Sequence, residues 1–373
     1  MQYRKFGNTG VEISALGFGC MRLPEYEENG QWFIDQDKTN AMLKRAFELG
    51  VNYFDTAPFY CHSNSPKSIG IALKPFRDKI MLTTKLPVGD VNDPSDYRRF
   101  LERYLTDIDT DYIDFFHFWG IGKDVFDNKM IKLNLLKEAT KAKDEGLIKH
   151  IAFSFHDEAP SIKYIIDRAP ELETLLVQYN LIDRSNEEMI AYAAEKGVGV
   201  VAMGPVGGGR LAAPTNIPKD WSGSKASYDF AMRFVLANKN ISCALSGMEN
   251  IEMLEQNAKI ASLEAPMTEN EWTDVKEAIE QTKKFSDLYC TGCKYCIDCP
   301  QKIDIAKIFE LYTYYNVYGI VDMTRQWYKE FTEDKTKAQI SDCTKCGLCE
   351  EKCPQKLEIR KHLDRVGEIL ANL

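Results

Sequence analysis

Residues 39–55, TNAMLKRAFELGVNYFD, contain the unit from which most of this chain is built. Residues 39–48 are helix-like and amphipathic, because apolar residues recur at the spacing of one helical face. A short apolar run then begins at Val51 and has the composition of a buried strand. Helix-like and strand-like stretches in alternation predict an α/β architecture with a parallel sheet.

The same unit recurs from about residue 15 to residue 260. Eight apolar, β-rich runs occur there, each followed by helix-like sequence, and they begin near Ala15, Val51, Ile80, Tyr112, Lys149, Thr174, Gly197 and Ile241. Eight units in roughly 250 residues is the size of a closed barrel. A doubly wound open sheet is the alternative, but no GxGxxG motif follows the first run. We therefore predict a (β/α)₈ TIM barrel, with a hairpin over residues 3–13 that covers one end.

The tail of the chain carries most of its cysteines. The first group, which precedes Pro300, is Cys290, Cys293, Cys296 and Cys299, and the second, which precedes Pro354, is Cys343, Cys346, Cys349 and Cys353. Three closely spaced cysteines with a fourth before proline are typical of two-cluster ferredoxins, in which the fourth ligand belongs to the other cluster. By that pattern one [4Fe-4S] cluster is held by Cys290, Cys293, Cys296 and Cys353, and the other by Cys343, Cys346, Cys349 and Cys299. Two Cys₄ zinc sites are the alternative, but they use separated CxxC pairs.

One departure from the ferredoxin pattern lies in the first group, where two residues rather than three precede the last cysteine. Between the two groups lie an aromatic, helix-compatible segment over residues 303–318 and a charged segment over 326–338. A domain this small needs its metal to fold, because its apolar burial alone is marginal. We predict a barrel over residues 1–264, a linker over 265–284 and an all-α iron-sulfur domain over 285–373.

Composition excludes several classes of function. The formal net charge of −9 argues against a nucleic-acid-binding protein, which concentrates Lys and Arg on one face. The first residues lack the apolar stretch of a signal peptide, and no run is long enough to span a membrane. Many cysteines in an unexported chain indicate metal binding or catalysis rather than disulfides. We expect a cytoplasmic protein whose partners are a small-molecule substrate and an external electron carrier.

Four polar residues lie where predicted strands end. Asp55, Lys85 and His117 close apolar runs, and Tyr60 follows Asp55 by five residues. Barrel active sites form at the carboxyl ends of the strands. A Tyr beside a Lys is a credible general acid, because the ammonium group stabilises the phenolate and lowers the pKa of the Tyr. His117 could donate a hydrogen bond to a carbonyl oxygen as that oxygen gains charge.

Several segments resemble the aldo-keto reductase family over residues 3–260. They are Phe54-Asp55-Thr56-Ala57-Pro58-Phe59-Tyr60, Thr84-Lys85-Leu86, Asp114-Phe115-Phe116-His117, Val177-Gln178-Tyr179-Asn180 and residues 247–257. The tail from Cys290 resembles the dicluster helical ferredoxin-type domain that is fused to a subset of that family. The resemblance implies an NAD(P)H-dependent oxidoreductase that acts on a carbonyl or alcohol.

The resemblance also implies roles for individual residues. Asp55, Tyr60, Lys85 and His117 match the catalytic tetrad, with Tyr60 as the proton donor. Ser154 and Gln178 match the residues that hold the nicotinamide carboxamide. The implied cofactor-binding set is completed by Gly19, Cys20, Met21, Met203, Gly204, Pro205, Val206, Gly207, Gly247, Met248, Glu249, Gln256 and Asn257.

Three residues depart from the family pattern. Met203 stands where an aromatic residue usually stacks on the nicotinamide, and Phe155 stands where an Asn usually follows Ser154, so that His156 is a candidate to replace that amide. Glu249 stands where NADPH-dependent relatives often carry an Arg. A carboxylate there repels a 2′-phosphate, so we expect a modest preference for NADH.

Two other functions compete with a carbonyl or alcohol oxidoreductase. The barrel could bind a nucleotide as a redox sensor. Alternatively, the chain could be an electron-transfer component whose clusters are only structural. The complete set of Tyr60, Lys85, Asp55 and His117 favours catalysis, since a sensor has no need of a Tyr beside a Lys. Fold analogy alone does not decide between these functions.

Overall fold

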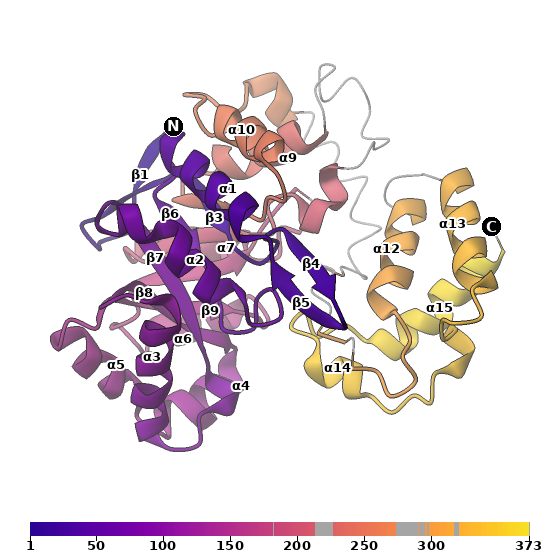
Figure 1. The fold of residues 1–373 in the computed structure, drawn as a ribbon, viewed down its shortest axis with the longest axis horizontal. Helices are drawn as coiled ribbons and strands as arrows, with labels where there is room; N and C mark the ends of the chain where they lie inside the picture. Colours follow the sequence, from indigo (N-terminus) through magenta and orange to yellow (C-terminus); the bar gives the residue numbers. More distant parts are fainter. Residues whose placement is uncertain are drawn as a thin grey trace. The chain divides into compact units, whose positions relative to one another are not determined.

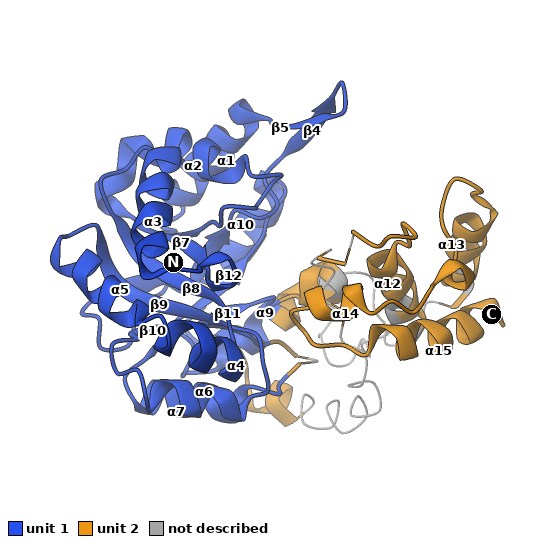
Figure 2. Ribbon diagram, turned by 90° about the horizontal axis from the view of Figure 1, so that it is seen from below, with its two compact units in different colours: residues 1–179, 184–205, 232–266 blue, residues 180–183, 206–231, 267–373 orange. Residues whose placement is uncertain are grey.

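The computed structural model describes residues 1–181, 183–212, 227–273, 290, 295–296, 298–316 and 321–372. The chain forms two compact units, shown in Figure 2. Unit 1 comprises residues 1–179, 184–205 and 232–266, and unit 2 comprises residues 180–183, 206–231 and 267–373. Most of the predicted linker, residues 274–284, lies outside the described residues.

Unit 1 is a closed barrel of eight parallel strands, which confirms the predicted fold class (Figure 1). In chain order the strands are β3 (Leu16–Gly19), β6 (Tyr53–Asp55), β7 (Met81–Pro87), β8 (Ile113–Ile121), β9 (Ile148–Phe155), β10 (Thr174–Gln178), β11 (Gly199–Met203) and β12 (Cys243–Ser246). The ring closes because β12 pairs with β3. The strands are buried on both faces, as expected when a barrel interior and an outer helical layer cover them.

Helices follow the strands and surround the barrel (Figure 1). They are α1 (Gln36–Glu48), α2 (Ser65–Leu73), α3 (Pro94–Ile108), α4 (Lys123–Val125), α5 (Leu135–Asp144), α6 (Pro160–Ile166), α7 (Glu187–Glu195), α9 (Ser227–Ala237) and α10 (Ile251–Ile260). A π-helical turn follows α4 at Phe126–Ile131, and short 3₁₀ turns lie at Lys74–Lys79 and Val88–Asp90. Each helix returns the chain to the start of the next strand, so all strand carboxyl ends share one rim.

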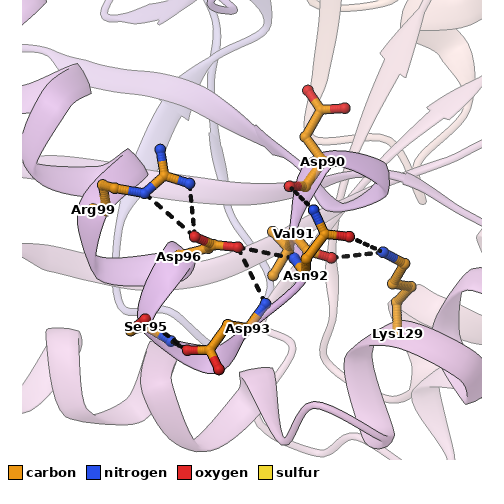
Figure 3. Close-up of polar contacts among 8 residues, drawn as sticks. All are labelled: Asp90, Val91, Asn92, Asp93, Ser95, Asp96, Arg99 and Lys129. Atoms are coloured by element: carbon orange, nitrogen blue, oxygen red, sulfur yellow. Dashed lines mark hydrogen bonds and ion pairs between the residues drawn. The ribbon is translucent and has the colours of Figure 1, made fainter.

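The start of α3 shows how the sequence fixes a helix end (Figure 3). The carboxylate of Asp93 accepts a hydrogen bond from the backbone N–H of Ser95 at 2.9 Å, and the carboxylate of Asp96 accepts from the N–H of Asp93 at 3.1 Å. This reciprocal capping box satisfies donors that the helix cannot pair. Arg99 also binds Asp96, at 2.6 Å, and its hydrogen bond is the main cause that lowers the pKa of Asp96 to about 2.

Two hairpins are added to the barrel. The predicted N-terminal hairpin pairs β1 (Tyr3–Lys5) with β2 (Glu12–Ser14). Its Phe6 is fully buried and packs against Phe115 and Tyr53, so this hairpin closes the amino-terminal end of the barrel. A second hairpin, β4 (Glu25–Glu28) with β5 (Gln31–Ile34), follows the first barrel strand and projects from the barrel (Figure 2).

Unit 2 is helical where it is described. Its elements are a 3₁₀ turn at Gly207–Ala212, α12 (Ile305–Asn316), α13 (Val321–Glu333), a 3₁₀ turn at Ile340–Asp342, α14 (Leu348–Lys352) and α15 (Ile359–Ala371). Its small core contains Phe309, Leu363 and Val366 together with Cys353, and several other cysteines pack against it. Among the described helices of the whole chain, none combines the length and apolar character needed to cross a membrane.

Candidate functional site

The four predicted catalytic residues meet at the carboxyl rim of the barrel. Lys85 and His117 lie directly opposite each other on paired strands β7 and β8, and Asp55 ends the neighbouring strand β6. The Lys85 ammonium group donates to Asp55 Oδ1 at 2.5 Å, to the Thr56 carbonyl at 2.9 Å and to Tyr60 Oη at 2.9 Å. The three donors of the ammonium group therefore each have a partner.

The ion pair between Asp55 and Lys85 is buried, since both side chains are at most 2% exposed. Burying two charges costs free energy unless additional hydrogen bonds complete the site. Thr83 supplies one of them, because its hydroxyl donates to Asp55 Oδ2 at 2.6 Å. Both partners of the carboxylate lie on β7, and the carboxylate fixes the position of the ammonium group beside Tyr60.

Tyr60 lies in a loop that is held on several sides. The three residues after it, Cys61, His62 and Ser63, all have left-handed backbone angles, with φ of 53°, 53° and 69°. Non-glycine residues rarely adopt this conformation, which costs roughly 1–2 kcal/mol per residue. The loop is closed by Ser65, whose hydroxyl hydrogen-bonds with that of Thr56 at 2.8 Å and contacts the Cys20 carbonyl at 2.9 Å.

The β4–β5 hairpin contacts the outer side of this loop. The ring of Trp32 stacks on that of His62 with 4.9 Å between centroids, and the Glu25 carboxylate lies 2.9 Å from His62 Nδ1. The Asn64 amide donates to the Trp32 carbonyl at 2.8 Å. The hairpin therefore braces the segment that follows Tyr60, a contact that strand-end reasoning does not reveal.

His117 is a fully buried imidazole that stays neutral near pH 7. Burial lowers its pKa to about 4, an effect that the charge of Asp55 only partly opposes. Neither ring nitrogen makes a hydrogen bond of normal geometry to the described residues. A buried donor with no such partner is suited to an oxygen atom brought in by a ligand.

The expected lowering of the Tyr60 pKa is wrong for the resting protein. Burial raises the pKa of Tyr60 well above its usual value of about 10, and the negative charge of Asp55 raises it further. The phenol therefore keeps its proton until it is needed. The neighbouring ammonium group of Lys85 can favour the phenolate once that proton has left.

The two residues predicted to hold the nicotinamide carboxamide lie on two further strands at the same rim. Ser154 is near the end of β9, where its hydroxyl accepts a hydrogen bond from the Gly120 N–H at 3.2 Å. Gln178 ends β10, and its amide lies against Gly204, where a Cβ atom would come within 2.7 Å of the amide nitrogen. Gly204 also has φ of 64°, so glycine is required both for conformation and for space.

Residues of β3 and β12 form a second part of the predicted cofactor site. Gly19 ends β3 beside the Ser246 carbonyl and the Gly247 backbone, and Asn257 donates to the Ser246 hydroxyl at 3.2 Å. Met203 ends β11. Cys20 and Met248 are buried, whereas Met21 is exposed. The Gln256 amide donates to the Glu252 carboxylate. Pro205 follows in unit 1, whereas Val206 and Gly207 belong to unit 2.

Two departures from the family pattern also have defined surroundings. Glu249 forms an exposed ion pair with Arg22 at 3.2 Å, so the charge expected to repel a 2′-phosphate is partly neutralised. Phe155 is buried at the end of β9, paired with Ile121 of β8, and the N–H of His156 donates to the Ile121 carbonyl at 3.2 Å.

In unit 2, four of the predicted cluster cysteines line one cavity. They are Cys299, Cys343, Cys346 and Cys349, together with Arg360 and apolar residues such as Ile303 and Leu363. Cys299 thus lies with the second cysteine group, as the exchange of the fourth ligand requires. No three described Cys, His, Asp or Glu side chains converge closely enough for a single metal ion.

The remaining predicted ligands are only partly described. Cys353 is buried in the core of unit 2, and Cys290 and Cys296 pack against the same core. Cys293 lies outside the described residues. Thiol donors gathered around a cavity and an adjoining apolar core fit iron-sulfur clusters, whose ligands are thiolates in shielded surroundings.

Comparison with known proteins agrees with this geometry. The model of the aldo/keto reductase family matches residues 15–227, which is more than half of the chain.

The chain belongs to the aldo/keto reductase family.

Its cysteine-rich tail matches the model of a 4Fe-4S dicluster domain over residues 289–358. Among curated relatives of this aldo/keto reductase, L-galactose dehydrogenase of Arabidopsis thaliana is 29% identical over 318 residues, which cover 76% of this chain and 96% of that protein. The uncharacterized oxidoreductase YqkF of Bacillus subtilis is 27% identical and covers 78% of this chain and 98% of that protein. The chain is an oxidoreductase of the aldo-keto reductase type.

Solved structures show the same fold. Aldo-keto reductase AKR11C1 from Bacillus halodurans in its holo form superposes with a TM-score of 0.63 at 25% identity, covering 74% of this chain and 96% of that one. The chain therefore spans nearly all of these three proteins and extends beyond the match.

Sequence reasoning missed several residues of this aldo/keto reductase. Thr83 and Arg22 were not singled out, because the strand register and the loop that bring them to Asp55 and Glu249 are tertiary features. The bracing hairpin had a usable signal. Asn29-Gly30 is a typical pair for a tight hairpin turn, and both residues have positive φ in the structure.

Proposed function

We propose that this protein is an NAD(P)H-dependent oxidoreductase that reduces a small carbonyl compound or oxidises the matching alcohol, with Tyr60 as the proton donor. The single observation that carries this proposal is the 2.9 Å hydrogen bond from Lys85 to Tyr60 above the buried Asp55. A general acid needs a proton that it holds at rest and can release at little cost in the reaction. Burial supplies the first property and the ammonium group the second.

The residues of the barrel rim fit a nicotinamide cofactor. Ser154 and Gln178 present a hydroxyl and an amide at neighbouring strand ends, and Gly204 leaves space beside the amide. When bound, the cofactor would supply or accept hydride. The protein would orient the nicotinamide through these polar groups, while Glu249, Gln256 and Asn257 would hold the adenosine part.

The protein's own contribution to carbonyl reduction concerns the carbonyl oxygen. As negative charge develops there, Tyr60 donates its proton from Oη, and Lys85 stabilises the phenolate that remains. The neutral imidazole of His117 can donate a hydrogen bond to the same oxygen, because no described group of the resting site competes for it with normal geometry. Asp55, which accepts a hydrogen bond from Thr83, holds Lys85 in place before and after the proton transfer.

The test is Tyr60→Phe, measured as NADH and NADPH oxidation with a panel of small aldehydes and ketones. We expect loss of carbonyl reduction with nucleotide binding retained, because the proton is needed only as the alkoxide develops. Tyr3→Phe is the matched control, since it removes a tyrosine hydroxyl that binds the Gly50 carbonyl near the N-terminal hairpin. Undiminished turnover in Tyr60→Phe would remove Tyr60 from the mechanism.

We further propose that unit 2 holds two [4Fe-4S] clusters with the cysteine sets given above, which pass electrons to or from an external carrier. The lining of one cavity by Cys299 and three cysteines of the second group supports this assignment. Anaerobically purified protein should contain about eight irons and eight acid-labile sulfides per chain. Stoichiometric zinc with negligible sulfide would exclude the assignment.

A further inference from the structure

Arg360 faces the cavity that is lined by Cys299, Cys343, Cys346 and Cys349. It is the second residue of α15, and its guanidinium group reaches back over the loop between Cys343 and Cys349. Nη1 donates to the Lys345 carbonyl at 3.3 Å, and the group lies within 3.7 Å of where a Cβ atom would stand at Gly347. Arg360 is thus anchored beside the thiols.

Glu350 holds the guanidinium group in this place. Its carboxylate accepts hydrogen bonds from Arg360 Nε at 2.9 Å and Nη2 at 2.6 Å, and also one from the Arg360 backbone N–H at 2.8 Å. The hydrogen bonds to Glu350 raise the pKa of Arg360. The guanidinium-bearing side chain lines the same cavity as Cys346 and Cys349.

Two other cations of unit 2 are lysines near the cysteines, and each has a carboxylate partner of its own. Lys345 pairs with Asp364 at 2.9 Å, and Lys352 pairs with Asp298 at 2.7 Å. Neither lysine is among the residues that line the cavity, whereas Arg360 is. An arginine also cannot lose its proton in a protein, so its charge is permanent.

We propose that Arg360 sets the reduction potential of the cluster held by Cys299, Cys343, Cys346 and Cys349. This inference rests on the proposed function, in which those cysteines hold a [4Fe-4S] cluster. Reduction adds one electron to the cluster and breaks no bond, so a fixed positive charge beside it favours the reduced form. Glu350 opposes part of that effect while it orients the guanidinium group.

The size of the effect follows from the position of the charge. Arg360 is 45% exposed, so solvent and salt screen part of its field. We expect its removal to lower the ratio of reduced to oxidised cluster about tenfold at a fixed solution potential, which equals about 59 mV for one electron. The cluster assigned to Cys290, Cys293, Cys296 and Cys353 should change much less.

The experiment is an anaerobic potentiometric titration of the full-length protein with dithionite, followed by electron paramagnetic resonance. Iron and sulfide are counted first, so a failure of the cluster assignment is seen separately from a failure of this inference. Arg360→Gln should shift one of the two potentials downward, and Arg360→Lys should retain most of the wild-type value. Lys361→Gln is the matched control, because it removes the next cation along α15, which pairs with Glu358.

Glu350→Gln provides a second, independent variant with the opposite sign, since it removes the carboxylate and leaves the guanidinium charge. We expect the same cluster's potential to rise. Two unchanged potentials in fully loaded Arg360→Gln would overturn the inference. If Arg360→Gln does not assemble its clusters, Glu350→Gln decides, and an unchanged or lowered potential there would overturn it.

Discussion

Lys85 shows how single atoms define the barrel site. Its ammonium group connects the buried carboxylate of Asp55 to the phenol of Tyr60, so a change of one residue alters the charge and the geometry together. Sequence placed these three residues and His117 at one rim because the carboxyl ends of parallel strands meet there. The sequence did not predict the direction in which the Tyr60 pKa is shifted, because burial is a property of the folded site.

His117 makes stability depend on pH. Its pKa of about 4 lies below the unfolded value of about 6.5, so the folded state resists a proton that the unfolded state accepts. This contribution is fully present above pH 6.5 and is lost as pH falls toward 4, by up to about 3 kcal/mol. The barrel's unfolding free energy should therefore fall less steeply over this range in His117→Asn than in the wild type. An equal dependence of the unfolding free energy on pH in both proteins, measured by urea titrations at several pH values, would contradict this.

The ion pair between Arg22 and Glu249 bears on the choice of cofactor. We expect modestly tighter binding of NADH than of NADPH, a stronger preference in Arg22→Gln, and a weaker one in Glu249→Gln. The reason is that Arg22 partly cancels the charge that would repel a 2′-phosphate. Fluorescence titration with both nucleotides measures the ratio of dissociation constants. Tighter binding of NADPH to the wild type would refute the preference.

At the scale of elements, the β4–β5 hairpin stabilises an otherwise strained loop. The barrel strands could be predicted from apolar runs in the sequence, because each strand is buried on both faces. This hairpin has exposed aromatic residues and only a short apolar run at residues 32–34, so its turn pair is the clearer sequence signal. Its function as a brace depends on the contact between Trp32 and His62, which lie 30 residues apart.

Trp32→Ala should loosen the segment behind Tyr60. A stacked pair contributes about 1 kcal/mol, so backbone amides of residues 61–65 should exchange with solvent roughly fivefold faster. Tyr26→Ala is the matched control, because Tyr26 is also an exposed aromatic residue of the same hairpin but stacks on Phe33. Hydrogen exchange read by mass spectrometry separates the two variants. Identical exchange in both would show that the hairpin does not brace the loop.

The ligand sets of the two predicted clusters contain cysteines that differ in their protection from solvent: Cys346 belongs to the set with Cys299, and Cys353 to the set with Cys290. Cys346 is exposed, whereas Cys353 is buried in the core of unit 2. Oxidation proceeds from solvent-accessible thiolates, so air should destroy the cluster at Cys346 first. Iron and sulfide should then fall in two phases, with about half of each lost in the faster phase. A single phase would show that both clusters are equally accessible.

At the scale of the whole molecule, the proposed function combines two chemistries that differ in electron count. Nicotinamide transfers two electrons as hydride, whereas an iron-sulfur cluster accepts one at a time. The resemblance to the aldo-keto reductase family implied the first part, and cysteine spacing predicted the second. Residues such as Val206 and Gly207 were predicted together with the barrel, yet they fall in unit 2, because a boundary inside a loop leaves no mark on strand periodicity.

We expect that NADH or NADPH alone does not reduce the clusters of the isolated protein, although dithionite does. Direct exchange needs an intermediate that tolerates a radical, such as a flavin or a suitable substrate. Visible absorbance after anaerobic mixing with excess nucleotide measures the result, and dithionite provides the positive control. Rapid bleaching by nucleotide alone would overturn this expectation and would mean that the two chemistries exchange electrons directly.

The closure of the barrel has a consequence for how the protein is made. β3, near the start of the chain, completes the ring only by pairing with β12. Arg4 donates to the carbonyls of Ile241 and Leu236, and the Gln2 N–H to that of Ala261. A ribosome releases these partners only after it has made the other barrel strands, so a nascent chain that stalls before β12 leaves the edge of β3 open to other strands. We therefore expect newly synthesised protein to need protection of the β3 edge until translation has passed β12.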